Sequence, residues 1–156
     1  MSAPFVTIVL PGSPRGKGRP RTAVRGSFAT IFTDKKTRNY ENDLKAAGIK
    51  AMEGLEVAMG PLSVAVRAYM VIPASWSQKK RQAALSGDLM PTTGVDLDNI
   101  CKMLDGLNYR LPAYKGDKSK WPIVWGNDAQ IINLHAMKFY SDQPRLEVSV
   151  WKWDQP

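Results

Sequence analysis

The chain has 156 residues, of which 44% are hydrophobic and 23% charged, and it carries a formal net charge of +8 at pH 7. This composition excludes a largely disordered chain, and the length predicts one domain that spans residues 1–156. The excess of positive charge favours a polyanionic partner, with nucleic acid as the leading candidate.

Cysteine and histidine usage excludes several kinds of site. The single cysteine, Cys101, cannot form an internal disulfide or a multi-cysteine zinc site, and the single histidine, His135, cannot make a histidine-rich metal centre. A bound metal would therefore be held mainly by oxygen. No apolar run approaches the roughly 18 residues of a membrane helix, and the N-terminus lacks a secretory signal pattern. We therefore expect a cytoplasmic protein with no membrane partner.

The first half of the chain predicts strands on either side of one long helix. Residues 5–10 and 27–32 are β-rich and are expected to be short strands. Asp34 is a suitable cap for a polar, amphipathic helix that is predicted from about residue 35 to 52. Residues 62–72 predict a longer strand with alternate apolar positions on one face.

A basic segment lies between the first two predicted strands. Glycines and prolines in residues 13–27 disfavour regular structure and predict an exposed loop. Its cations suit contact with phosphate groups, and the alternative is a solvated flexible loop. The candidate DNA-binding residues are Arg15, Lys17, Arg19, Arg21 and Arg25.

The second half of the chain predicts two further helices and two strands. Residues 75–87 resemble a short helix with a serine start and a glycine stop, and another helix is expected from Asp98 onward. A long exposed loop is expected over residues 108–124. Residues 128–140 and 145–153 are strand patterns joined by a turn, which predicts a closing hairpin. Together the elements predict an α+β (mixed α/β) fold, with a single sheet of about five strands and helices packed on it.

The segment "GVDLDNICK" gathers acids in an otherwise basic chain. As the expected N-cap of its helix, Asp98 shares one helical face with Lys102 and Asp105, opposite an apolar face. Asp96 precedes it in an extended segment, so the carboxylates of Asp96 and Asp98 are expected to point to the same side. A third acid that is expected to converge on this site, Asp128, stands at the head of a predicted strand.

Two explanations of these acids stay open on the residues alone. The acids can be helix caps and members of weak surface pairs, which is a common role of acids near helix ends. Three converging carboxylates instead repel one another unless a cation neutralises them, and clustered oxygens are the ligands that Mg²⁺ or Mn²⁺ prefers. A calcium loop is excluded, because it needs an acid or amide, a glycine and a glutamate where this chain has Ile100, Cys101 and Leu107. A nucleotidyltransferase-like D-x-D motif stays a further alternative.

The motifs "DLDNICK", "LDGLN" and "NDAQI" together resemble those of the RusA family of phage and bacterial Holliday-junction resolvases. The segments "PGSPRGKGRPR" and "FTDKKTRNYE" also look like the opening of RusA-like phage proteins. The resemblance implies a small α/β homodimer that cuts four-way DNA junctions symmetrically with Mg²⁺. It places Asp96, Asp98 and Asp128 as metal-binding catalytic acids. It places Lys102 as the essential lysine near the scissile phosphate.

The chain departs from the family pattern at several positions. Asn127 replaces the first acid of the D-D-x-Q motif, and Val95 stands where a basic residue or a proline often precedes the first acid. The spacing from Lys102 to Asp105 is shorter than usual, so the resemblance gives Asp105 no role. The loop over residues 108–124 is longer than the usual connection. Preference among junctions, flaps and replication forks therefore stays open.

The residues and the resemblance together predict a Mg²⁺-dependent, structure-selective endodeoxyribonuclease of DNA recombination and repair. Lys102 is expected to offset charge that develops on the phosphate, while Asn99 and Gln130 are expected to orient ligands or water. Paired cuts in a two-fold symmetric junction need two active sites, so a homodimer is expected. The alternative is a noncatalytic protein that binds branched DNA through the same basic surface.

Overall fold

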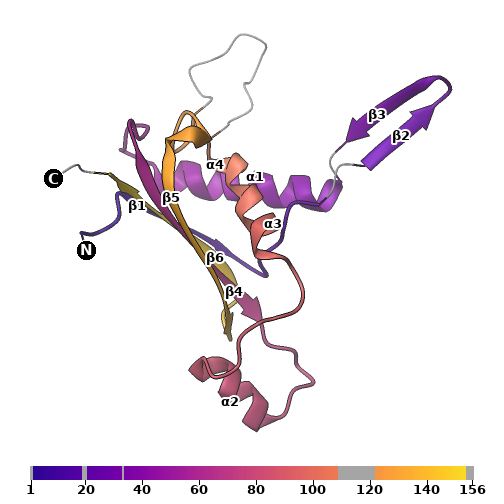
Figure 1. Ribbon diagram of the computed structural model, residues 1–156, viewed down its shortest axis with the longest axis vertical. Helices are drawn as coiled ribbons and strands as arrows, with labels where there is room; N and C mark the ends of the chain where they lie inside the picture. Colours follow the sequence, from indigo (N-terminus) through magenta and orange to yellow (C-terminus); the bar gives the residue numbers. More distant parts are fainter. Residues whose placement is uncertain (1, 19–20, 33, 109–121, 154–156) are drawn as a thin grey trace.

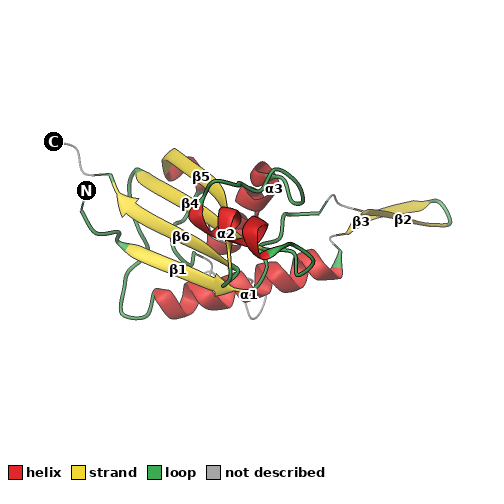
Figure 2. Ribbon diagram, turned by 90° about the horizontal axis from the view of Figure 1, so that it is seen from below, coloured by secondary structure: helices red, strands yellow, loops and turns green. Residues whose placement is uncertain are grey.

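The computed structural model describes residues 2–18, 21–32, 34–108 and 122–153. Within this part of the chain, four strands form the central sheet in the order β1-β6-β4-β5 (Figure 2). Their bounds are Val6–Pro11 for β1, Arg145–Lys152 for β6, Leu62–Val71 for β4 and Ile131–Ser141 for β5. β6 runs antiparallel to both of its neighbours, whereas β4 and β5 are parallel.

One face of the sheet carries the core, because apolar residues alternate along the strands. In β4 the side chains of Leu62, Val64 and Val66 are buried on this face. Helix α1 (Lys35–Ala51) packs beside β1 and contributes Leu44 to the same buried cluster (Figure 1). The alternation that the sequence predicts for this strand is therefore confirmed.

The predicted start of one helix and the predicted stop of another are confirmed. Helix α1 begins where Asp34 Oδ1 accepts a hydrogen bond from Thr37 N at 3.1 Å. Helix α2 (Gln78–Ser86) ends as expected at Gly87, which has a φ of +88°, but it is capped by the hydroxyl of Ser77 and not by Ser75, so the expected start is two residues too early. None of the helices in the described part of the chain is long and apolar enough to span a membrane.

The helical segment with the acids contains α3 (Leu97–Cys101), a 3₁₀ turn η1 (Lys102–Leu104) and α4 (Asp105–Asn108). Its N-cap is Asp96, so the expectation that Asp98 caps the helix is wrong. Asp98 lies in the first turn, where its negative charge is favourable to the helix dipole. The apolar face is confirmed, because its members are all buried: Ile100, Met103, Leu104 and Leu107.

The α+β fold is confirmed, but the expected single sheet of about five strands is wrong in its strand pairing. The strand expected at residues 27–32 pairs outside the central sheet, as β3 (Phe28–Phe32) in a two-stranded ribbon with β2 (Arg21–Arg25). Arg21 and Arg25 therefore lie in a strand and not in an irregular loop. Gly26 has a φ of +61° and forms a tight turn, which allows the two short segments to pair.

The expected closing hairpin is wrong as well, because β4 lies between β5 and β6. Val71 near the end of β4 pairs with Ser141, whereas Tyr69 pairs with Arg145 at the start of β6. The turn that joins β5 to β6 thus passes across the end of β4. A local turn signal predicts a reversal of chain direction, but it does not determine which strand becomes the neighbour.

The loop expected over residues 108–124 is only partly described, since residues 109–121 lie outside the described part of the chain. At its end, Ile123 and Val124 are buried in the core, so the expectation of an exposed loop is wrong there. Val124 N donates a hydrogen bond to Leu107 O at 2.8 Å. This bond fixes the end of α4 beside the segment that leads to Asp128.

Gly48→Ala is expected to destabilise the protein by about 1–2 kcal/mol. Alanine normally favours a helix over glycine by roughly 1 kcal/mol, but a Cβ at Gly48 would lie 2.8 Å from Leu107 Cδ2 and 3.2 Å from Ile123 Cγ2. Denaturant unfolding measures the change. Ala46→Gly on the exposed side of α1 is the control, since only helix propensity acts there. A more stable Gly48→Ala protein would mean that α1 does not closely contact α4.

Candidate active site

A cavity of about 460 Å³ lies along the exposed side of the helical segment that begins at Asp96. Carboxylates and cations make up most of its wall, together with one amide and one glycine. The lining residues are Lys17, Gly18, Asp96, Asp98, Asn99, Lys102 and Asp105. The cavity therefore brings together the motif acids and a cation from the basic N-terminal segment.

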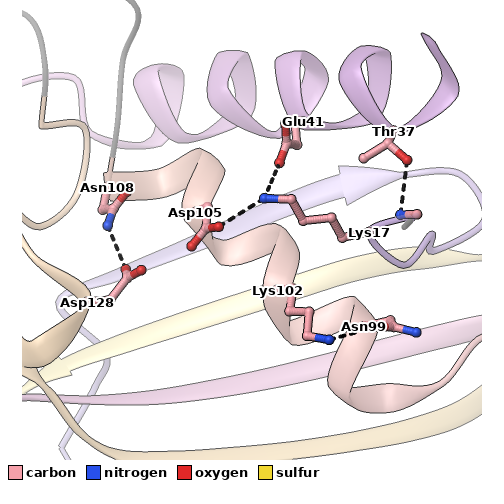
Figure 3. A network of polar contacts seen from close by, with 9 residues as sticks. Lys17, Thr37, Glu41, Asn99, Lys102, Asp105, Asn108 and Asp128 are labelled. Atoms are coloured by element: carbon pink, nitrogen blue, oxygen red, sulfur yellow. Dashed lines mark hydrogen bonds and ion pairs between the residues drawn. The ribbon is translucent and has the colours of Figure 1, made fainter. Parts of the chain in front are cut away.

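Asp98, Lys102 and Asp105 share one face of the helical segment, as their spacing predicts. Lys102 Nζ lies 3.9 Å from Asp98 Oδ2. The same nitrogen donates a hydrogen bond to Asn99 Oδ1 at 3.2 Å (Figure 3). The side chains of Asp98 and Lys102 are 74% and 59% exposed, so solvent screens their attraction. Lys102 is thus held only loosely by Asp98.

Asp96 provides a test of the explanation that the acids are only caps. Its backbone holds the N-cap position of α3, with φ −69° and ψ 137°, but its side chain makes no capping hydrogen bond. An aspartate at an N-cap ordinarily accepts such a bond from the first turn. Asp96 instead lines the cavity with Asp98, so helix capping does not explain its carboxylate.

Lys17 joins the acids of two helices. Its Nζ donates a hydrogen bond to Asp105 Oδ2 at 3.0 Å and lies 3.4 Å from Glu41 Oε1 on α1 (Figure 3). Partial burial opposes the charge on Lys17, but the hydrogen bonds and negative charges of Asp105 and Glu41 outweigh it and raise the pKa of this amine. Lys17 therefore stays protonated and fixes the Asp105 carboxylate.

Backbone contacts hold the Lys17 segment against both helices. Lys17 N donates to Asn99 O at 2.9 Å, and Gly18 N donates to Thr37 Oγ1 at 3.1 Å. A Cβ at Gly16 would lie 2.7 Å from Val95 Cγ1 and 2.8 Å from Asn99 Cβ, so a glycine is needed for this close approach. The start of the basic segment is thus a fixed wall of the cavity.

Asp128 lies next to Asp105 on a separate segment. Its Oδ1 accepts hydrogen bonds from Asn108 Nδ2 at 2.7 Å and from Trp125 Nε1 at 2.9 Å. Burial raises the pKa of the Asp128 carboxyl, the bond from Trp125 opposes this, and the neighbouring Asp105 carboxylate raises it further. Asp105 is therefore a close neighbour of Asp128 and favours the protonated form of its carboxyl.

Gln130 fixes the loop that carries Asp128. Its Nε2 donates to Ala58 O and Gly60 O, both at 3.0 Å, while its Oε1 accepts from the backbone nitrogens of Gly126 and Asn127. Asn127 caps the 3₁₀ turn η2 (Asp128–Gln130). Gln130 therefore orients the backbone around Asp128, and Asn99 contacts Lys17 and Lys102.

The three acids that the sequence analysis predicts as metal ligands lie in two neighbouring parts of the site. Asp96 and Asp98 share the cavity with Asp105, and Asp128 is the neighbour of Asp105. In the described part of the chain, no group of three or more histidine, cysteine, aspartate or glutamate side chains is closely enough arranged to hold a metal ion. The donor chemistry nevertheless fits a hard divalent cation, since carboxylate oxygens are the ligands that Mg²⁺ and Mn²⁺ prefer. A cation would also relieve the repulsion between Asp105 and Asp128.

The predicted DNA-binding residues have different positions. Arg15 is exposed and lines a second cavity of about 360 Å³ that shares Lys17 and Asp96 with the first. Arg25 is exposed at the end of β2, and Arg21 begins that strand. Arg19 lies outside the described residues.

Helical spacing predicts that Asp105 shares a face with Asp98 and Lys102, but it gives Asp105 no role in the cavity. Sequence reasoning missed three other residues of this site. Glu41 and Asn108 carry no such signal, since only tertiary packing brings them to Lys17 and Asp128. Trp125 is the third missed residue. It is near Asp128 in sequence, but the sequence does not indicate that it is fully buried and donates a hydrogen bond to the Asp128 carboxylate.

Comparison with known proteins gives two matches. Residues 11–151 match the model of a protein family described as Endodeoxyribonuclease RusA. The uncharacterized protein YqaN of Bacillus subtilis (strain 168) is 31% identical over 148 residues, which cover 93% of this chain and 94% of that protein. The family match includes every residue of the acid cavity described above.

Proposed function

Because this chain belongs to the RusA endodeoxyribonuclease family, we propose that it resolves four-way (Holliday) DNA junctions by Mg²⁺-dependent hydrolysis of paired phosphodiester bonds. The observation that carries this proposal is the cavity in which Asp96, Asp98 and Asp105 lie with Lys102. The net charge of +8 supports a DNA substrate. We further propose that the chain forms one endonuclease domain and acts in recombination and repair in a bacterial cytoplasm.

Our proposed ligands of the divalent cation are Asp96 and Asp98 in the cavity and Asp128 beside it, with Asp105 between them. In this structure the three ligands are not close enough together to hold one ion. When bound there, the cation would supply Lewis-acid activation of water and of the scissile phosphate. Trp125 and Asn108 hold the Asp128 carboxylate by hydrogen bonds, so its position is set before substrate arrives. Such preorganisation is favourable, because groups that are already oriented need not reorganise during the reaction.

The cations of the site have separate roles in this mechanism. Lys102 is exposed at the cavity and would offset negative charge that develops on the phosphate or on the leaving oxygen. Lys17 is held by Asp105 and Glu41 and would keep the acid cluster from excessive negative charge. Arg15, which is exposed and lines the second cavity, would attract the DNA backbone.

A noncatalytic DNA-binding protein is the second candidate. It requires that the acids serve as caps or as surface pairs. The side chain of Asp96 argues against that requirement, because it lines the cavity and makes no capping hydrogen bond. Binding to four-way junctions without any Mg²⁺-dependent cutting would favour this candidate.

A cruciform plasmid tests the paired reaction that we propose. One copy of the acid cavity cannot cut two opposed strands together, so the enzyme should be a homodimer that linearises the plasmid within one binding event. Light scattering at micromolar concentration measures the oligomeric state of the same sample. A stable monomer that yields only nicked circles would replace the resolvase by a simple nickase.

A further inference from the structure

The β2–β3 ribbon projects from the rest of the molecule. Figures 1 and 2 show it extending beyond the N-terminal end of α1, away from the central sheet. An isolated two-stranded ribbon is only marginally stable in water, because it has no core of its own. Its surface is therefore a candidate for contact with a partner.

The ribbon exposes large apolar side chains. Phe28 is 77% exposed, Ile31 72% and Val24 70%. The segment from Arg21 to Phe32 contains two arginines and no acid. The ribbon thus combines exposed apolar side chains with charges that are all positive. This combination suits a polyanionic partner that also offers apolar surface, as the bases of DNA do.

The tip of the ribbon places a cation beside an aromatic ring. Arg25 and Phe28 are paired across the strands and flank the two-residue turn, so both side chains lie on the same face. Val24 pairs with Ala29 on the opposite face. Five residues per strand give the ribbon a length of about 16 Å. Arg25 and Phe28 are thus displayed at the end that is farthest from the body.

The base of the ribbon lies at the acid cavity. Gly18, which lines the cavity and is bonded to Thr37, shortly precedes β2, and Asp34 at the N-cap of α1 shortly follows β3. The ribbon therefore extends from the rim of the cavity, where the phosphate backbone would lie. DNA that occupies the cavity would pass along it.

We propose that the ribbon is an arm that recognises the branch point of the DNA, with Phe28 stacking on a base and Arg25 contacting a neighbouring phosphate. This inference rests on the proposed function, since the branched DNA is the substrate of the cavity. Bases at a branch point are less completely stacked than those in a duplex, so an aromatic side chain can reach them at lower cost. Phe28 would then provide selectivity for branched DNA, and Arg25 would provide affinity for DNA of any shape.

A second copy of this chain is the other conceivable occupant of the arm. The ribbon carries only positive charge, and a second copy brings a net charge of +8. Like charges disfavour that contact, whereas DNA is complementary in charge. The charge balance therefore favours DNA.

Binding in the absence of divalent metal tests the proposal. A four-way junction with 2-aminopurine at the branch point and a duplex of equal length are titrated with wild type, Phe28→Ala and Phe28→Trp. The matched control is Val24→Ala, which removes a comparably exposed apolar side chain from the other face. Phe28→Ala should weaken junction binding about tenfold, since stacking contributes about 1–3 kcal/mol per base, and it should change duplex binding less than twofold. Phe28→Trp and Val24→Ala should keep the selectivity of the wild type.

The fluorescence of 2-aminopurine should change when wild type binds and should not change with Phe28→Ala. The proposal is overturned if Phe28→Ala binds the junction as the wild type does, or if it loses junction and duplex affinity equally. It is also overturned if the substitution dissociates a dimer, because the arm would then be a protein interface.

Two further outcomes separate the arm from the proposed nuclease. If junction preference depends on Phe28 but the protein never cuts DNA with Mg²⁺, the proposal for the arm is supported and the nuclease activity is rejected. Failure of wild type to bind either DNA would reject both.

Discussion

Asp96→Asn, Asp98→Asn and Asp128→Asn are each expected to abolish Mg²⁺-dependent cutting of a four-way junction and to leave folding and DNA binding intact. Each change removes one negative charge and one hard oxygen ligand while it preserves the size of the side chain. The loss should exceed the roughly 10- to 100-fold typical of removing a group that only supports a metal ligand. Junction affinity should stay the same or increase, since less negative charge faces the phosphates.

Single-turnover cutting rates and metal-free binding curves measure the two effects separately. Glu56→Gln is the control, since it removes one exposed acid that does not line the cavity and should cut at the rate of the wild type. Thermal unfolding checks that each variant is folded. Near-normal turnover in any one of the three aspartate variants would remove that residue from the site.

Asp105→Asn is expected to reduce cutting by about 10- to 100-fold and to raise the Mg²⁺ concentration needed for half-maximal rate. Asp105 lines the cavity with Asp96 and Asp98, bonds to Lys17 and is the neighbour of Asp128. The substitution removes the negative charge that lies between Asp96 and Asp98 on one side and Asp128 on the other. It also leaves the Lys17 amine with Glu41 alone.

A double-mutant cycle with Lys17→Met tests this second result. Because Lys17 and Asp105 are in direct contact at 3.0 Å, the two substitutions together should cost less than the sum of their separate effects. Glu41→Gln is the matched control within the same network, since it keeps the contact between Lys17 and Asp105 and should change the rate only slightly. If Asp105→Asn cuts at the wild-type rate and needs the same Mg²⁺ concentration, then Asp105 is only a surface partner of Lys17.

The sequence predicts the local parts of the site well, because helical spacing is a local property. Asp98, Lys102 and Asp105 recur at intervals that place them on one face, and the opposite face is buried as expected. The role of Asp105 could not be predicted from this spacing. It depends on Lys17, which reaches the helix only because Gly16 permits a close approach to Asn99.

Strand positions were predictable, whereas strand neighbours were not. The alternation in β4 indicates a half-buried strand, but nothing local indicates that β4 separates β5 from β6. The strand over residues 27–32 is predicted and found as β3, but β2 and its pairing with β3 were missed for a different reason. Glycine, proline and arginine around β2 favour a loop, and the strand forms through pairing with β3 across the turn at Gly26.

Cutting of a synthetic four-way junction with and without Mg²⁺ tests the central claim most directly. The junction should have a branch point that cannot migrate, and each of its strands should be labelled in a separate experiment. A duplex and a flap of equal length serve as comparisons. The account predicts symmetrically placed cuts on two opposed strands in the presence of Mg²⁺, none after chelation, and none with Asp96→Asn. Tight junction binding by wild type without metal-dependent cuts, across several junction sequences, would contradict it.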